Sequence, residues 1–340
     1  MTRGRLYRGA MNRRFIFLLL FSTFLVLPFR SPAPLIYTPG EGWVYEPVGG
    51  EGKWQRARAK DQLIVAQEAF DKKDYSLASK AAHRTVKVWP LSDYAPQAQY
   101  LVGRCYEARG LDERAFKEYQ KLLEQYPKAI VYDDVLKRQY EIANRFLAGE
   151  WFRLWGYIPF FPSMEKTADL YQKIVKNGPY SDIAPQAQMK IGEAREKQSN
   201  YPAAVKAYER AADRYNDRPE IASDALFKQA MAYNQQAATA EYDQNTAAQA
   251  IATFTDFMTL FPNDARVPEA EKIIANLRME QARGNLEIAK YYEKQHHLVS
   301  AKIYYNEVVN LTLNEPNSAY AVQARERLDA LNQRLQSANK

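Results

Sequence analysis

The sequence has very few of the residues that build disulfides and metal sites. Its 340 residues include one cysteine, Cys105, and three histidines. A single cysteine excludes a disulfide within the chain and any site built from several thiolates. His296 and His297 are adjacent, whereas metal ligands on one helix face lie three or four residues apart. We therefore expect no metal and no cofactor.

Sequence motifs of catalysis are also missing. The chain has no GxxxxGK[ST] or GxGxxG loop for phosphate, no GxSxG elbow and no HExxH pair. Its acidic residues stand beside basic ones at helical spacing, as in Lys117-Glu118 and Glu209-Arg210, which is typical of ion pairs on solvated helices. We therefore expect a non-catalytic protein.

Excess charge is confined to the N-terminus. The chain has 47 basic and 40 acidic residues, and residues 1–30 contain six arginines and no acid, so the rest has 41 basic residues against 40 acidic ones. A net charge of +1 gives no overall basic field for nucleic acid.

Residues 1–33 are predicted to be a targeting segment. Five arginines precede the apolar run Phe15–Leu27, and this order is typical of a secretory signal. A run of thirteen residues is shorter than the roughly 20 apolar residues that a membrane-spanning helix needs. We expect export to the periplasm, with either a cleaved signal or an uncleaved N-terminal anchor.

Residues 34–54 are predicted to be a linker, because their proline and glycine content excludes a helix. The linker is unusually aromatic, with Tyr37, Trp43, Tyr45 and Trp54. These rings either cap the first repeat, since terminal repeats expose apolar faces, or contact a protein or membrane surface.

The rest of the chain, residues 55–340, contains an internal repeat. Ser92–Pro127 returns as Ser181–Asn216, and the opening octets SDYAPQAQ and SDIAPQAQ differ at one position. The pattern of small residues, a large aromatic such as Tyr119 and a final proline is typical of the tetratricopeptide repeat (TPR), a pair of helices. Gly103 is predicted to lie where the two helices approach closely.

Equivalent positions of the large residue predict an all-α TPR solenoid of five to six helix pairs over residues 55–340. Their spacings are 37, 52, 37, 46 and 51, which places insertions at residues 147–163 and 235–246, and Gly284 is expected to end a helix. These positions are Ala82, Tyr119, Tyr171, Tyr208, Phe254 and Tyr305.

The first insertion, Leu147–Ser163, is too aromatic for a disordered loop. Its rings either fold back over the neighbouring repeat or form a wedge for a partner or the lipid interface, and we expect at least one to remain available. They belong to Trp151, Phe152, Trp155, Tyr157, Phe160 and Phe161.

The first helices of TPR pairs line a concave face that binds extended partners. Polar and aromatic side chains at exposed first-helix positions are therefore the candidate partner-binding residues. They are Gln97, Tyr100, Arg104, Tyr140, Asn144, Gln186, Met189 and Glu193.

The signal, the chain length and these repeats together resemble BamD, the periplasmic component of the outer-membrane β-barrel assembly machine. The motifs that carry the resemblance are the openings Ser92–Gln99 and Ser181–Gln188 and the terminal Tyr126-Pro127. It implies a scaffold at the outer membrane that binds the barrel insertase and unfolded outer-membrane proteins. The alternative is a periplasmic TPR adaptor for cell division or peptidoglycan synthesis, similar to CpoB.

One feature differs from the BamD pattern. BamD is acylated on a cysteine directly after its signal, whereas no cysteine precedes Cys105 here. We therefore expect membrane association through an uncleaved signal or the aromatic segments rather than through a lipidated cysteine.

Overall fold

The computed structural model describes residues 35–38, 42–45, 54–154, 158–239 and 244–338. The predicted targeting segment, residues 1–33, lies outside this part of the chain. The described residues form helices and two short hairpins, which confirms the all-α repeat fold. The chain divides into two compact units, residues 1–101 and 102–340, and the division falls inside helix α4, Ala95–Ala108.

The described part of the first unit consists of one hairpin, one helix pair and the start of α4. Strands β1 (Leu35–Thr38) and β2 (Gly42–Tyr45) pair antiparallel within the predicted linker, with Tyr37 opposite Trp43. Helices α2 (Ala59–Asp71) and α3 (Tyr75–Val88) pack through buried alanines. Helix α3 begins where the Asp74 side chain accepts a hydrogen bond from the Leu77 amide, 3.0 Å away, which satisfies an otherwise unpaired helix N–H.

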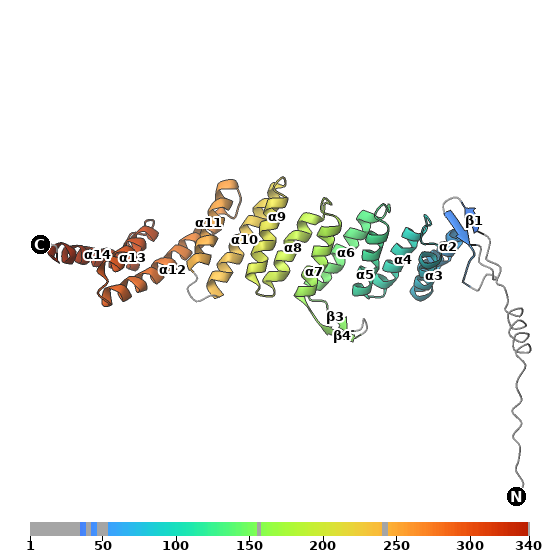
Figure 1. Cartoon of the computed structure of the whole chain (residues 1–340), viewed down its shortest axis with the longest axis horizontal. Helices are drawn as coiled ribbons and strands as arrows, with labels where there is room; N and C mark the ends of the chain where they lie inside the picture. The colour runs from blue at the N-terminus through green and yellow to red at the C-terminus, as the bar shows by residue number, and fades with distance from the viewer. Residues whose placement is uncertain (1–34, 39–41, 46–53, 155–157, 240–243, 339–340) are drawn as a thin grey trace, which may run out of the picture. The chain divides into compact units, whose positions relative to one another are not determined.

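In the second unit the helices follow one another as antiparallel neighbours in the order of the sequence (Figure 1). The hairpin of β3 (Phe152–Leu154) and β4 (Ile158–Phe161) interrupts the third pair. The helices after α4 are α5 (Asp112–Gln125), α6 (Tyr132–Leu147), α7 (Met164–Asn177), α8 (Ala184–Glu196), α9 (Tyr201–Arg214), α10 (Pro219–Thr239), α11 (Gln244–Leu260), α12 (Val267–Lys294), α13 (Leu298–Leu311) and α14 (Ala319–Ala338).

The repeat motif sets the packing within each pair. All six equivalent positions read from the sequence, from Ala82 to Tyr305, are fully buried. A Cβ atom added to Gly192 would lie 2.3 Å from the Tyr208 ring, and one added to Gly103 would lie 2.3 Å from Tyr119. Only glycine allows this approach, which explains the small residue of the motif.

The last glutamine of the repeated octet is structural as well. Gln188 is buried, and its side-chain amide donates to the Ala207 carbonyl on the second helix of the pair, 2.9 Å away. This bond satisfies a buried polar group and links the two helices.

Two of the long spacings between equivalent positions fall at long helices. Helix α12 has 28 residues, twice the 14 of α13, which accounts for the 14 residues by which the last spacing exceeds 37. The predicted insertion at residues 235–246 includes the last turn of α10, which reaches Thr239, and the first turn of α11, which begins at Gln244.

The prediction that Gly284 ends a helix is wrong, because α12 continues through it. A glycine inside a helix costs about 1 kcal/mol relative to alanine, which packing can offset. Here the neighbouring Asn285 is buried and accepts a hydrogen bond from Gln244 at 3.2 Å, while Gln281 donates to the Gln244 carbonyl at 3.3 Å. The start of α11 thus contacts α12 on both sides of this glycine.

Arg266 links α10, α11 and α12. Its guanidinium donates to Asp224 and Asp264 at 2.8 Å each and lies over the rings of Phe227 and Phe257. Cation–π contacts of this kind add to the ion pairs. The hydrogen bond from Arg266 lowers the pKa of Asp264 from 3.8 to about 2, although partial burial opposes the shift.

A depressed folded-state pKa makes stability depend on acid. The contribution of Asp264 is fully present above the unfolded pKa of 3.8 and is lost as the pH falls toward 2. We expect the free energy of unfolding of the wild type to fall more steeply between pH 4 and 2 than that of Asp264→Asn. Denaturant titrations at several pH values measure this slope, with the exposed Asp256→Asn as the control. Equal slopes for wild type and Asp264→Asn would contradict the assignment.

Candidate functional site: the first-helix face and the aromatic hairpin

The candidate residues of the first-helix face differ in accessibility. Gln97 and Gln186 are exposed, and Tyr100, Arg104 and Glu193 are partly exposed. The prediction that Met189 is exposed is wrong. Only 8% of Met189 is exposed, and it packs in the core with Val205 and Tyr208. The unbranched thioether of Met189 fills space beside the tyrosine ring. Met189 is therefore buried, although Tyr100 at the equivalent position of the other repeat is partly exposed.

Tyr140 and Asn144 are tied to the buried tyrosine of their own repeat. The ring of Tyr140 meets the Tyr171 ring edge-on, with centroids 5.8 Å apart. The Tyr171 hydroxyl donates to the Asn144 side-chain oxygen at 2.6 Å. Both residues therefore stabilise the repeat, and a partner at this position would contact a fixed surface.

A glutamate recurs with the buried tyrosines and was not predicted from the sequence. Three tyrosine hydroxyls donate to a glutamate 12 residues earlier, at the end of the first helix, over 2.7 to 2.9 Å. The constant spacing was the available signal. The pairs are Tyr119–Glu107, Tyr208–Glu196 and Tyr305–Glu293.

Two of these glutamates also bind arginines from the first helix of the following repeat. Glu107 binds Arg138 at 3.2 Å and Arg145 at 3.6 Å, and Glu293 binds Arg327. Burial, then the bond to Glu293, raises the pKa of Tyr305 to about 12. The phenol therefore stays protonated and acts as a hydrogen-bond donor between helices.

The charged groups around the Tyr208–Glu196 pair include both acids and lysines. Burial raises the pKa of Glu196, and the charges of Glu193 and Asp224 add to this, while the Tyr208 hydroxyl and Lys228 oppose it. Burial also opposes ionisation of Glu193, but its hydrogen bond from Lys190 and the charges of nearby lysines lower its pKa overall. Two glutamates three residues apart on α8 thus have pKa values shifted in opposite directions.

The hairpin β3–β4 both packs on the repeat and exposes aromatic surface. Phe152 is buried and stacks on Phe146 of α6, with ring centroids 4.1 Å apart. Lys166 of α7 lies over the rings of Phe152 and Phe161, at 5.1 and 5.7 Å. Trp151 and Phe161 remain 52% and 41% exposed.

Three predicted ring positions of the insertion are not placed by the structure. Trp155 and Tyr157 lie outside the described residues, as does the side chain of Phe160, whose backbone belongs to β4. In the described part of the insertion, Phe152 folds back into the core, whereas Trp151 and Phe161 face solvent. Contact of these exposed rings with a partner or with lipid stays a prediction.

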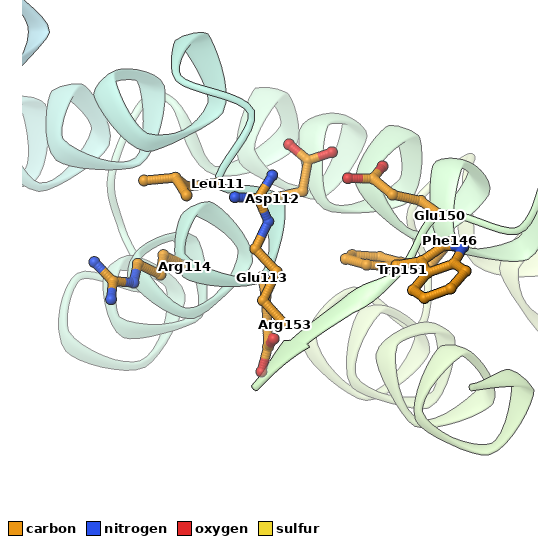
Figure 2. A pocket seen from close by; sticks show the side chains of 8 residues that line it. All are labelled: Leu111, Asp112, Glu113, Arg114, Phe146, Glu150, Trp151 and Arg153. Atoms are coloured by element: carbon orange, nitrogen blue, oxygen red, sulfur yellow. The ribbon is translucent and has the colours of Figure 1, made fainter. Parts of the chain in front are cut away.

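Polar contacts hold the base of the hairpin. Arg153 donates to the Gly110 carbonyl at 3.0 Å, and Arg145 binds the buried Asp112 at 2.5 Å. Burial, then the charge of Asp112, raises the pKa of Glu150. Figure 2 shows a small pocket at this place, lined by side chains that include Asp112, Glu150, Trp151 and Arg153.

In the part of the chain that the structure describes, the geometry identifies no reaction centre. Among the described residues, no group of three or more His, Cys, Asp or Glu side chains could hold a metal ion. Burial raises the pKa of the Cys105 thiol to about 12, which disfavours the nucleophilic thiolate. In the same part of the chain, no helix is long and apolar enough to cross a membrane.

Two family models match the chain. Residues 66–130 match the tetratricopeptide repeat, and residues 163–311 match YfiO, described as an outer membrane lipoprotein. The second match begins at Ser163, the N-cap of α7, and ends at Leu311, the last residue of α13. The chain is a BamD-like TPR protein. In this BamD-like chain, residues 131–162, with α6 and the hairpin, lie between the two matched segments.

Solved structures similar to this BamD-like chain are also TPR proteins. One is the C-terminal part of a TPR protein from Cytophaga hutchinsonii, with 15% identity over 78% of this chain and 87% of that one and a TM-score of 0.34. Another is a TPR protein from Parabacteroides merdae, with 14% identity over 80% of this chain and 98% of that one and a TM-score of 0.30. A search of curated proteins found no match.

Proposed function

We propose that this protein is a non-catalytic periplasmic scaffold for the assembly of β-barrel proteins at the outer membrane. In this role it binds the barrel insertase and unfolded outer-membrane proteins. The observation that carries the proposal is the match of α7–α13 to the outer membrane lipoprotein family, on helices that form TPR pairs. Stacked TPR pairs present an extended surface for protein partners.

Affinity capture tests this function. The tagged protein is recovered from detergent-solubilised envelopes, and bound proteins are identified by mass spectrometry. We expect recovery of the barrel insertase. Recovery of peptidoglycan synthases without the insertase would contradict the proposal and favour the division adaptor.

The exposed rings of the hairpin are the part of the surface that we expect to contribute most to partner binding. Large aromatic side chains at partly exposed positions are enriched at energetically important interface sites. Replacing both Trp151 and Phe161 by alanine should leave the thermal midpoint unchanged and reduce recovery of the partner several-fold in the capture experiment. The matched control is Tyr180→Ala, which removes a ring that is exposed in the α7–α8 loop. If the Trp151/Phe161 variant recovers the partner as the control does, the hairpin has no such role.

A further inference from the structure

We propose that a basic hollow between α5 and the hairpin binds an acidic, extended segment of a partner polypeptide. The site is separate from the first-helix face, and the inference does not depend on the function proposed above. The hollow has a volume of about 450 Å³, within the range of ligand sites. Its lining includes Tyr106, Glu113, Arg114, Lys117, Lys121 and Arg153.

The charge of the hollow is positive. Four cationic side chains line it together with two carboxylates, those of Glu113 and Glu118, which gives a net charge of +2. Lys117 pairs with Glu113 at 3.4 Å, and Lys121 pairs with Glu118 at 2.8 Å. Arg153 donates to a neutral group, the Gly110 carbonyl, at 3.0 Å, and its guanidinium lines the hollow, where its charge attracts a carboxylate.

The groups of the hollow fit a peptide better than an isolated anion. The cations stand on two elements, with Lys117 and Lys121 about one helical turn apart on α5 and Arg153 on β3. Carboxylates spaced along an extended segment reach both elements at once, whereas a single small anion occupies only one of these positions.

The half-exposed indole of Trp151 adjoins the basic hollow. Glu113, Arg114 and Arg153 also line the smaller pocket of Figure 2, whose wall includes the partly exposed Trp151. A bound segment that places its carboxylates in the hollow therefore brings an adjacent apolar side chain onto the indole. Hence the predicted ligand is an acidic stretch with a neighbouring aromatic residue.

Binding of a defined peptide to the purified full chain tests the inference. The probe is a short fluorescent peptide of alternating aspartate and glycine around one tryptophan, compared with the same peptide carrying asparagine. Fluorescence anisotropy should show binding of the acidic peptide at least about tenfold tighter, weakening as salt rises. Arg153→Gln and the double variant Lys117→Gln, Lys121→Gln should each raise Kd about fivefold or more. Lys173→Gln, at an exposed position of α7, is the matched control.

The binding measurements distinguish an acidic polypeptide from other occupants of the hollow. No binding of the acidic peptide, or equal binding to all variants with unchanged circular dichroism, overturns the inference. If Arg153→Gln perturbs folding, the double lysine variant decides alone, because both lysines lie on the exposed face of α5. Displacement of the peptide by an equal concentration of single-stranded oligonucleotide would also overturn it, since the site would then select phosphate rather than an acidic polypeptide.

Discussion

Replacing Gly192 by alanine is expected to lower the free energy of unfolding by about 1–3 kcal/mol, and replacing it by leucine by more. The new Cβ would lie 2.3 Å from the Tyr208 ring. That ring cannot move aside cheaply, because it is fully buried and its hydroxyl is bonded to Glu196 at 2.9 Å. Gly103→Ala should behave alike, since it faces Tyr119 in the same way.

Denaturant unfolding measures this effect. Ala252→Leu, on the exposed face of α11, is the control for adding a large side chain to a helix and should change stability little. The double variant Gly192→Ala, Tyr208→Leu should recover part of the loss, because a smaller neighbour removes the clash. Unchanged midpoints for Gly192→Ala and Gly103→Ala would refute the assigned helix contact.

Replacing Phe152 by alanine is expected to cost about 3–5 kcal/mol of stability, as deletion of a buried aromatic side chain generally does. Phe152 is buried, stacks on Phe146 and lies under Lys166. The variant should also detach the hairpin from α6. Limited proteolysis with mass spectrometry should then show cleavage within residues 150–163 that is absent from the wild type.

Trp151→Ala is the matched control for this variant, because it removes a neighbouring ring that is half exposed. It should change the thermal midpoint by only a small amount and leave the hairpin resistant to protease. If both variants unfold at the wild-type temperature, the hairpin does not belong to the core and is a separate appendage.

The repeat fold could be predicted from the sequence because its constraints are local. Gly103 and Tyr119 lie within one repeat, and the octet that begins at Ser92 returns at Ser181, so pattern and spacing alone specify the helix pair. Gly284 shows the limit of such local reasoning. A glycine near an expected helix end predicts a stop, yet contacts from α11, distant in sequence, carry α12 through it.

The candidate site was less predictable, because exposure depends on neighbours that the sequence does not name. Tyr100 and Met189 hold equivalent positions in the repeat, but Met189 turns into the core beside Tyr208. The insertion at residues 147–163 was recognised by its aromatic content, whereas its β-hairpin and the division between the buried Phe152 and the exposed Trp151 required the structure. The tyrosine–glutamate pairs were readable at their constant spacing of 12 and were missed.

The proposed role of this BamD-like protein in barrel assembly is tested in the cell. The protein is depleted from its own cells, and folded barrel proteins in the outer membrane are measured by heat-modifiable electrophoretic mobility. We expect the folded barrel fraction to fall before growth stops and to return when the wild-type chain is restored. Unchanged barrel folding together with a defect in septation or peptidoglycan synthesis would contradict it.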